Sequence, residues 1–445
     1  MKKVSEKINE YEVGVVGLGY VGLTLATMLA DVGVKVMGVE KRQAVVDDLN
    51  KCKPHFVENG LDVVLRNSIK SENLRCFNKF TDNTSCKIYI ITVGTPLDND
   101  GNARIDMIEH ASNEVAEHMP EGALVIVRST VKIGTTRNIV KPILESSGKS
   151  FSLAMCPERT LEGNALRELR TIPQIIGADD DHTLDLAEKL FQKLTKTTIR
   201  VNKFEAAEIL KLVDNTYRDV QFAFANEVAR ACEAFGVNSF EVISSGKLGY
   251  GRTNVALPGL VGGPCLEKDP HIFQQSVNDK IGIDLEITKA ARLVNERQPK
   301  ETVEFIVRNM KERGLSSSDK ITVLGIAFKG YPETDDLRGA MSLKVIQELK
   351  KQLPNLDLNI FDPIVKKEDL KDVLPEAKIH DCISEATTDA SVILITNNHY
   401  KFRDMAFDDL ISPLKNKGFI FDYWNNFSHL NKETVKKTYF AVGNI

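Results

Sequence analysis

The sequence lacks the features that would place the chain in a disulfide-rich, metal-binding or membrane class of protein. Its seven cysteines are odd in number and scattered without a CxxC pair, which excludes a disulfide framework and predicts no metal site. No run of about 18 apolar residues occurs, so we expect no transmembrane helix and no membrane partner. A formal net charge of -4 gives no reason to expect a nucleic-acid partner. The first ten residues are polar, with charges of both signs, which is unlike a signal peptide and predicts a cytoplasmic protein.

The composition that is present is ordinary for a globular protein, with 42% hydrophobic and 27% charged residues. A chain of 445 residues can form roughly two to four domains, each with its own core. The alternation of apolar runs with helical patterns predicts the α/β class. We expect two Rossmann-like, doubly wound lobes joined by a long central helix and a helical dimerisation segment.

A glycine-rich turn lies near the start of the chain. Residues 17–22 read Gly-Leu-Gly-Tyr-Val-Gly, between an apolar stretch that predicts a strand and a pattern that predicts a helix. With Glu40 at the end of the next predicted strand, this is the pattern of a βαβ dinucleotide site, in which an acid binds the adenosine ribose. Glu40 favours NAD over NADP. Lys41 and Arg42 follow directly and could bind the 2′-phosphate of NADP, so NADP stays an alternative. The alternative is a glycine-rich turn that binds no ligand.

Three further parallel strands are predicted, at 88–93, 123–127 and 151–155. In an open parallel sheet, ligands bind outside the carboxyl ends of the strands. The loops that follow these strands contain Thr95, Thr130 and Glu158, and we expect these side chains to face the nicotinamide side of the site. Polar loop residues without a ligand are the alternative.

Two long helices are predicted in the middle of the chain, over 205–235 and 283–313, and Pro299 can kink the second. On the first helix, polar side chains recur every three to four residues and therefore share one face. They are Glu208, Lys211, Asn215 and Arg218. A solvated charged stripe is the alternative. Two long helices between α/β lobes form a spine and predict a two-fold dimer surface.

Residues 258–269, Pro-Gly-Leu-Val-Gly-Gly-Pro-Cys-Leu-Glu-Lys-Asp, lie between the two halves of the chain. The glycines and proline at 262–264 predict a segment that is neither a regular helix nor a strand and that can approach a ligand closely. Cys265 is followed by Lys268 and Asp269 at the spacing of one helical turn, which suits a thiolate beside a cation and a carboxylate. The alternative is a buried cysteine that opens a helix.

The last part of the chain predicts a second nucleotide-binding lobe that has no dinucleotide site. Residues 320–330 run from a strand into a turn that lacks GxGxxG. A helix is predicted over 342–352 and further strands over 357–361, 391–396 and 418–421. Lys329 and Arg338 near strand ends suit a phosphate-bearing ligand. The residues after Trp424 give no prediction.

Together these motifs resemble the UDP-glucose/GDP-mannose dehydrogenase family of nucleotide-sugar 6-dehydrogenases, from about residue 11 to about residue 425. The resemblance implies a homodimer of three-domain chains. The domains would be an NAD-binding domain at 1–200, a central helical dimerisation domain with the cysteine loop at 201–313, and a UDP-sugar-binding domain at 314–445. Besides the glycine-rich turn, the markers are Gly94-Thr95-Pro96-Leu97-Asp98, Ser129-Thr130-Val131, Gly134-Thr135-Thr136, Pro157-Glu158, Glu208-Ile209-Leu210-Lys211, Asn226-Glu227, Gly262-Gly263-Pro264-Cys265, Lys268-Asp269 and Ala327-Phe328-Lys329.

The chain departs from the family pattern at four places. Glu40 stands where Asp is usual, the glycine loop at 259–263 is one residue shorter, Arg338-Gly339-Ala340-Met341 replaces Arg-x-Ser-Pro, and Tyr331-Pro332 is an insertion. The form Cys156-Pro157-Glu158-Arg159 resembles members that act on UDP-N-acetylhexosamines, whereas other branches read Asn-Pro-Glu-Phe. It implies UDP-N-acetyl-D-mannosamine as the substrate, with UDP-N-acetyl-D-glucosamine as a close second and UDP-glucose as a further alternative.

The resemblance implies two successive hydride transfers from C6 of the sugar, so that two NAD are consumed. Lys211 and Asn215 would stabilise the alkoxide while Asp269, or a water that it holds, takes the proton. The Cys265 thiolate would add to the aldehyde as a thiohemiacetal, and the second hydride transfer would leave a thioester. Water would then hydrolyse the thioester.

The residues expected to form the site fall into three groups. The catalytic residues are Cys265, Lys211, Asp269 and Asn215, with Glu158 as the base of thioester hydrolysis and Thr130 positioning the water. The residues expected to bind NAD are Gly17, Gly19, Tyr20, Val21, Gly22, Glu40, Thr95 and Thr130. Those expected to bind the UDP-sugar are Glu158, Arg159, Glu162, Lys211, Asn215, Gly262, Lys329 and Arg338, together with Arg252, which the resemblance assigns to the partner subunit.

Two other classes of protein stay open. A β-hydroxyacid-type dehydrogenase shares the N-terminal fold and a lysine on the long helix. It needs no thiol, and it would form one NADH per substrate rather than two. A nucleotide-sensing or scaffold protein would form none, and the set of Lys211, Cys265 and Asp269 argues against it.

Overall fold

The computed structural model describes residues 9–81, 84–98, 101–428, 430, 435 and 438–444. The chain divides into two compact units, one of residues 1–214 and 271–283 and the other of residues 215–270 and 284–445. Two helices, α8 (Phe204–Ala234) and α11 (Asp269–Ile281), contain residues of both units. Among the described residues, no helix is long and apolar enough to cross a membrane.

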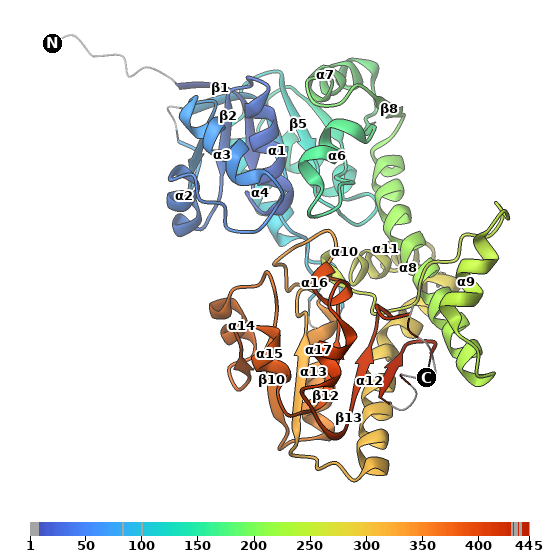
Figure 1. Cartoon of the computed structure of the whole chain (residues 1–445). Coiled ribbons are helices and arrows are strands. Elements are labelled where there is room, and N and C mark those ends of the chain that lie inside the picture. Colours follow the sequence, from blue (N-terminus) through green and yellow to red (C-terminus); the bar gives the residue numbers. More distant parts are fainter. Residues whose placement is uncertain are drawn as a thin grey trace. The chain divides into compact units, whose positions relative to one another are not determined.

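The first unit is built on an eight-stranded sheet with the order β3-β2-β1-β4-β5-β6-β7-β8 (Figure 1). Neighbouring strands are parallel except β6 and β7, which are antiparallel. The strands are β1 (Asn9–Val16), β2 (Val36–Val39), β3 (Leu74–Phe77), β4 (Thr84–Ile91), β5 (Ala123–Val127), β6 (Phe151–Met155), β7 (Gln174–Gly177) and β8 (Thr198–Val201). The helices are α1 (Tyr20–Asp31), α2 (Gln43–Asn50), α3 (Leu61–Lys70), α4 (Asp106–His118), the π-helix η1 (Thr136–Val140), α5 (Lys141–Glu145), α6 (Ala165–Thr171) and α7 (Asp181–Phe191).

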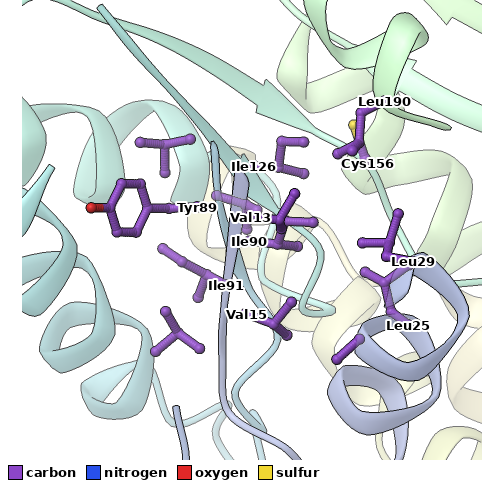
Figure 2. Close-up of a cluster of buried hydrophobic side chains, with 14 of the residues drawn as sticks. Val13, Val15, Leu25, Leu29, Tyr89, Ile90, Ile91, Ile126, Cys156 and Leu190 are labelled. Atoms are coloured by element: carbon purple, nitrogen blue, oxygen red, sulfur yellow. The ribbon is translucent and has the colours of Figure 1, made fainter. Parts of the chain in front are cut away.

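The core of this unit lies around its central strands. Every residue of β5 is buried, as expected for a strand with both faces covered. Figure 2 shows how Val13 and Val15 of β1 pack with Ile90 of β4 and with Leu25 of α1. The apolar runs in the sequence are thus strands of a sheet that is covered on both sides, and the polar turns at their carboxyl ends are left to bind ligands.

The second unit contains a six-stranded sheet in which all pairs are parallel, with the order β11-β10-β9-β12-β13-β14 (Figure 1). The strands are β9 (Lys320–Leu324), β10 (Asp357–Phe361), β11 (Lys378–Ile379), β12 (Ala390–Ile395), β13 (Leu414–Asp422) and β14 (Tyr439–Ala441). The helices are α9 (Ser239–Lys247), α10 (Gly263–Leu266), α12 (Glu286–Arg313), α13 (Met341–Gln352), α14 (Lys367–Val373), α15 (Ile383–Thr387), α16 (Tyr400–Arg403) and α17 (Phe407–Ile411). Two parallel-sheet lobes and a long central helix confirm the predicted fold class.

Two sequence predictions are wrong in detail, and one segment without a prediction contains a strand. Residues 263–266 form one helical turn, because Pro264 stands in its first turn, where a missing N–H breaks no helical hydrogen bond. The second long helix begins at Glu286 instead of residue 283, and it continues through Pro299. The tail after Trp424, for which no structure was predicted, contributes the edge strand β14.

A buried carboxylate ties this tail to the rest of the second sheet. Asp422, the last residue of β13, is fully buried. It accepts hydrogen bonds from the backbone N–H of Trp424 at 2.9 Å, from that of Asn426 at 2.7 Å and from the Tyr439 hydroxyl at 2.8 Å. Burial nevertheless raises the pKa of Asp422 to about 6, because the donors only partly replace water.

This raised pKa predicts a stability that depends on pH. The fold favours the protonated form of Asp422, so its contribution to the free energy of unfolding is complete below pH 4 or so and is lost as the pH rises through about 6. The free energy of unfolding of the Asp422→Asn variant should therefore rise by about 2 kcal/mol relative to the wild type between pH 4.5 and pH 8, measured by chemical denaturation. A difference between the two proteins that stays constant over this range would contradict the assignment.

Candidate active site

The glycine-rich turn between β1 and α1 has the geometry of a pyrophosphate cradle. Gly17 adopts a φ of +92°, and a Cβ at Gly22 would overlap the carbonyl oxygen of Gly17, so both positions require glycine. A Cβ at Gly19, by contrast, would meet nothing within 4 Å, which leaves space for a ligand. Helix α1 begins at Tyr20, so its N-terminal N–H groups and the positive end of its dipole face this space. The residues present therefore fit a dinucleotide.

Glu40 follows β2 and lies against the same turn. One carboxylate oxygen accepts a hydrogen bond from the backbone N–H of Leu18 at 3.2 Å, and the other accepts one from Arg42 Nε at 2.7 Å. Burial raises the pKa of Glu40, but the hydrogen bonds from Arg42 and Leu18 outweigh it and hold the pKa below its ordinary value. An ionised acid at this place can accept hydrogen bonds from ribose hydroxyls. In the sequence, Arg42 was a candidate to bind the 2′-phosphate of NADP. In the structure its side chain is paired with Glu40.

The loops after β4 and β5 are bonded to each other. The Thr95 hydroxyl donates to the carbonyl oxygen of Thr130 at 2.5 Å, and the Ser129 hydroxyl donates to the carbonyl oxygen of Val93 at 2.7 Å. Thr95 is buried and Thr130 is half-buried. The structure thus brings together two of the residues that the sequence placed at the nicotinamide side.

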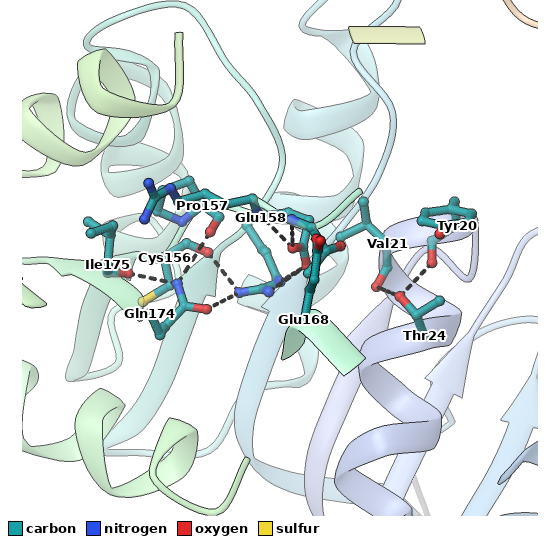
Figure 3. Close-up of polar contacts among 12 residues, drawn as sticks. Tyr20, Val21, Thr24, Cys156, Pro157, Glu158, Glu168, Gln174 and Ile175 are labelled. Atoms are coloured by element: carbon teal, nitrogen blue, oxygen red, sulfur yellow. Dashed lines mark hydrogen bonds and ion pairs between the residues drawn. The ribbon is translucent and has the colours of Figure 1, made fainter. Parts of the chain in front are cut away.

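Glu158, after β6, is held by a buried arginine that sequence reasoning did not single out. Arg128 donates to Glu158 Oε2 from Nε at 3.0 Å and from Nη2 at 2.5 Å, and its Nη1 donates to Gln174 Oε1 at 2.8 Å. Figure 3 labels the two partners, Glu158 and Gln174. The backbone N–H groups of Arg159 and Thr160 donate to Glu158 Oε1, both at 2.7 Å. Burial raises the pKa of Glu158, but Arg128 and these donors lower it by more than burial raises it, so the net shift of the pKa is downward. Glu158 is therefore ionised and oriented.

A second residue that was not singled out in the sequence is the acid Glu58. It accepts hydrogen bonds from the Tyr20 hydroxyl, from the backbone N–H of Gly163 at 2.6 Å and from that of Ala165 at 2.8 Å, so it caps the start of α6. Burial and the charges of Glu58 and Glu162 raise the pKa of Tyr20. Glu58 thereby links the glycine-rich turn to the loop that carries Glu162. No spacing rule connects residues so far apart in the sequence.

Three of the four polar residues predicted on one face of α8 are buried, which rules out a solvated stripe for them. Glu208 accepts hydrogen bonds from the backbone N–H of Gly134 at 2.5 Å and of Thr136 at 2.9 Å, so it holds the segment that follows Thr130. Lys211 and Asn215 are buried one turn apart. The charge of Lys211 contributes to the lowered pKa of Glu158. Arg218, the fourth, is exposed.

The cysteine segment joins two residues that the sequence placed in the site. Asn215 Nδ2 donates to Asp269 Oδ2 at 2.5 Å, and the ammonium of Lys268 lies 2.9 Å from Asp269 Oδ1. Asp269 is fully buried as the first residue of α11, whereas Cys265 on α10 is exposed. The alternative of a buried cysteine is therefore excluded. The thiol is accessible on a turn whose neighbouring carboxylate is fixed.

A buried polar network holds the backbone on both sides of Cys265. Asn226 of α8 bonds both backbone groups of Gly259, accepting from its N–H at 2.9 Å and donating to its carbonyl oxygen at 3.2 Å. Arg292 of α12 donates from Nη1 to the carbonyl oxygen of Leu266 and to Asp219 Oδ1, each at 2.7 Å. In the sequence, Asn226 was identified only as a family marker, and no motif predicted a role for Asp219 or Arg292.

The residues expected to bind the UDP-sugar are spread over several loops. Arg159 Nε donates to Asp214 Oδ2 at 2.8 Å in the first unit. In the second unit, Lys329 Nζ lies 5.3 Å from the centroid of the Phe328 ring, Arg338 pairs with Asp336, and the guanidinium of Arg252 lies 4.6 Å from the centroid of the Tyr250 ring. Arg252 and Arg338 are exposed. Exposed cations in a lobe without a glycine cradle suit an anionic ligand, as the sequence analysis expected.

A dinucleotide cradle with an ionised acid beside it, together with polar loops at the carboxyl edge of the same sheet, is typical of an NAD-dependent oxidoreductase. The family models for the NAD-binding, central and UDP-binding domains match residues 11–195, 205–297 and 322–429. The chain belongs to the UDP-glucose/GDP-mannose dehydrogenase family, whose members are nucleotide-sugar dehydrogenases. NAD is therefore its cofactor.

Individual relatives agree over nearly the whole chain. The UDP-N-acetyl-D-mannosamine dehydrogenase of Campylobacter jejuni is 33% identical over 415 residues, which are 90% of this chain and 98% of that protein. The structure of the UDP-N-acetyl-D-mannosamine dehydrogenase of Pyrococcus horikoshii matches with a TM-score of 0.87 and 30% identity, covering 97% of this chain and 99% of the other. The structure of a UDP-glucose dehydrogenase from Pyrobaculum islandicum matches with a TM-score of 0.86 and 25% identity, covering 99% and 100%.

The buried pair of Arg128 and Glu158 predicts a large effect on stability. The Arg128→Met variant leaves the Glu158 carboxylate buried without its cation, so its free energy of unfolding at pH 7 should fall by about 3–5 kcal/mol. The wild-type pKa of Glu158 is lowered from its ordinary value of 4.5, so the pair stays charged down to about pH 4.5. In the variant, burial without a cation raises the pKa of Glu158, so its carboxylate takes up a proton and the penalty shrinks as the pH falls towards 4.5. The gap between variant and wild type, measured by urea denaturation, should therefore narrow between pH 7 and pH 4.5.

Two further variants serve as controls for this prediction. Arg104→Met removes an exposed partner of Asp106, and because solvent screens this pair the free energy of unfolding should change far less than in Arg128→Met at either pH. The double variant Arg128→Met/Glu158→Gln removes both charges and should be more stable than Arg128→Met alone. A double variant no more stable than the single one would show that Glu158 carries no unpaired charge.

Proposed function

We propose that this chain catalyses the NAD-dependent four-electron oxidation of the C6 alcohol of a UDP-N-acetylhexosamine to the uronate, through a thioester on Cys265. UDP-N-acetyl-D-mannosamine is the substrate we favour. The observation that carries the proposal is the accessible Cys265 thiol four residues before Asp269, a buried carboxylate that Asn215 and Lys268 hold in place. A single oxidation of an alcohol needs no nucleophile, whereas two successive oxidations at one carbon do.

The first oxidation needs a proton acceptor and a group that stabilises the developing alkoxide. Asp269, or a water that it holds, takes the hydroxyl proton, and Asn215 keeps this carboxylate oriented. Lys211, one turn before Asn215 on α8, supplies the positive charge for the alkoxide. NAD, when bound at the glycine-rich turn, accepts one hydride in each oxidation. Thr95 and Thr130 form the polar edge for its nicotinamide.

The second oxidation begins when the Cys265 thiolate adds to C6 of the aldehyde and forms a thiohemiacetal. Loss of the second hydride from C6 gives a thioester, and attack by water then expels the thiolate and releases the carboxylate. Thr130 positions this water, and Glu158, which Arg128 keeps ionised, accepts its proton. In total, one alcohol, two NAD⁺ and one water give one carboxylate, two NADH and three protons.

The substrate assignment rests on the relatives and on one local feature. The relatives from Campylobacter jejuni and Pyrococcus horikoshii are both UDP-N-acetyl-D-mannosamine dehydrogenases by name. Arg159 is held by Asp214 of α8 directly before Asn215, in the sequence form that we associate with N-acetylhexosamines. UDP-N-acetyl-D-glucosamine stays as an alternative, and so does UDP-glucose, because the structure of the Pyrobaculum islandicum UDP-glucose dehydrogenase matches almost as well. The further substrate contacts we propose come from Glu162, Gly262, Lys329, Arg338 and a partner subunit's copy of Arg252.

We further propose the division into domains at 1–200, 201–313 and 314–445 and a homodimer formed by the central segment. Large apolar side chains are exposed on α8 and just beyond its end, including Tyr217, Phe224 and Phe235. A second copy of the chain would cover this surface through a two-fold contact.

The reaction can be tested by counting NADH over a panel of sugar nucleotides. Wild-type enzyme should form two NADH per UDP-N-acetyl-D-mannosamine, measured by absorbance at limiting substrate. The Cys265→Ser variant should form no more than one, because a serine hydroxyl is a far weaker nucleophile at neutral pH than a thiolate. Cys382→Ser, which changes a partly exposed thiol elsewhere in the second unit, should still form two.

The other outcomes separate the competing functions. One NADH per substrate in the wild type would support a single-oxidation, β-hydroxyacid-type enzyme. Two NADH from UDP-glucose alone would move the substrate to another branch of the family. Two NADH in the Cys265→Ser variant would remove the cysteine from the mechanism.

A further inference from the structure

Two of the places where the sequence departs from its family lie against each other in the second unit. One is the shortened glycine loop at 259–263, and the other is the altered turn at 338–341. The backbone N–H of Gly263 donates a hydrogen bond to the carbonyl oxygen of Gly339 at 2.7 Å. Gly263 is the first residue of the helical turn that carries Cys265. The thiol therefore stands two residues after a direct bond to the altered turn.

The two segments are so close that neither Gly262 nor Gly339 has room for a side chain. A Cβ at Gly262 would overlap the carbonyl oxygen of Gly339 and would lie 2.6 Å from Cγ of Met341. A Cβ at Gly339 would lie 2.8 Å from the carbonyl oxygen of Gly263 and would overlap the Glu267 carboxylate. Gly339 also has a φ of +61°, which favours glycine. The glycine loop at 259–263 and the turn at 338–341 thus form one packing arrangement.

The altered turn reaches the cysteine turn from a second side as well. The carbonyl oxygen of Asp336 accepts a hydrogen bond from the backbone N–H of Phe328 at 3.0 Å, and a Cβ at Gly263 would overlap the Phe328 ring. The Asp336 carboxylate binds the side chain of Arg338, with 2.5 Å to Nη2. Residues 336–341 therefore pack against the cysteine turn. They include Arg338, which we propose binds the nucleotide of the substrate.

We infer that Gly339 is a positioning residue for the Cys265 thiol and that it acts on the second oxidation. The inference rests on the proposed function, because it presumes that Cys265 is the nucleophile. Addition of a thiolate to a carbonyl carbon needs the two atoms within about 3–3.5 Å and aligned, so a small displacement of the turn slows this step strongly. The first oxidation uses Lys211, Asn215 and Asp269 and does not need the thiol, so a displaced thiol leaves it intact.

The test is a single-turnover stopped-flow measurement of NADH formation with enzyme in excess over the UDP-sugar. In the Gly339→Ala variant, the added methyl meets the Gly263 carbonyl and shifts the turn. The rate of the second NADH phase should fall at least about tenfold, while the first phase and the KM for the UDP-sugar stay within about threefold. Equal losses in both phases, or no loss in either, would overturn the inference.

A matched control separates backbone strain from displacement of the thiol. Gly314, at the end of α12, has a φ of +70°, and a Cβ there would meet nothing within 4 Å. Gly314→Ala therefore carries the same left-handed strain without a new contact, and both NADH phases should keep their wild-type rates. Selective loss of the second phase in Gly314→Ala as well would attribute the effect to general destabilisation and overturn the inference.

Met341→Ala keeps the inference testable if Gly339→Ala does not fold. It removes the side chain packed at Gly262 and adds no atom, so it loosens the same packing. The second phase should again slow more than the first, and equal rates in both phases would contradict a positioning role. Failure of the proposed function itself would look different, because the wild type would then show no second NADH phase at all.

Discussion

The hydrogen bond between Asn215 Nδ2 and Asp269 Oδ2, 2.5 Å long, is the interaction on which the proposed site most depends. It joins α8 to the first residue of α11 out of contact with solvent, since Asp269 is fully buried. The ammonium of Lys268, 2.9 Å from the other oxygen, compensates the buried charge, and such a charge is costly when its partners are removed. Cys265, the nucleophile we propose, is itself exposed. Its position therefore depends on this buried anchor four residues further along the chain.

The parts of the site that local rules determine could be predicted from the sequence. Gly17 needs a positive φ and Gly22 has no room for a Cβ, so their spacing identifies the dinucleotide turn without a structure. The helix predicted over 205–235 is observed over Phe204–Ala234, because its apolar residues keep one period for more than eight turns. The strand at 123–127 matches residue for residue, since a buried parallel strand is a continuous apolar run.

The contacts that support the catalytic groups could not be predicted, because they join residues that no periodicity relates. Arg128 and Glu158 are 30 residues apart, and their pairing depends on the order of the strands that carry them. Gly339 occupies the unspecified position of Arg-x-Ser-Pro, and nothing in the sequence relates it to the cysteine turn, to which its carbonyl oxygen is hydrogen-bonded. Glycine was predicted to keep this turn irregular. The structure shows instead a short helix, in which glycine admits the neighbouring backbone and Phe328.

In the mechanism that we propose, the sugar is covalently attached to Cys265 between the two oxidations. Acid quenching of wild-type enzyme during a single turnover with UDP-N-acetyl-D-mannosamine and NAD, followed by peptide mass spectrometry, tests it most directly. The peptide containing Cys265 should gain the mass of the oxidised UDP-sugar as an acyl group, and this modified peptide should accumulate and then decay as the second NADH forms. Two NADH formed while the Cys265 peptide stays unmodified at every quench time would contradict this mechanism.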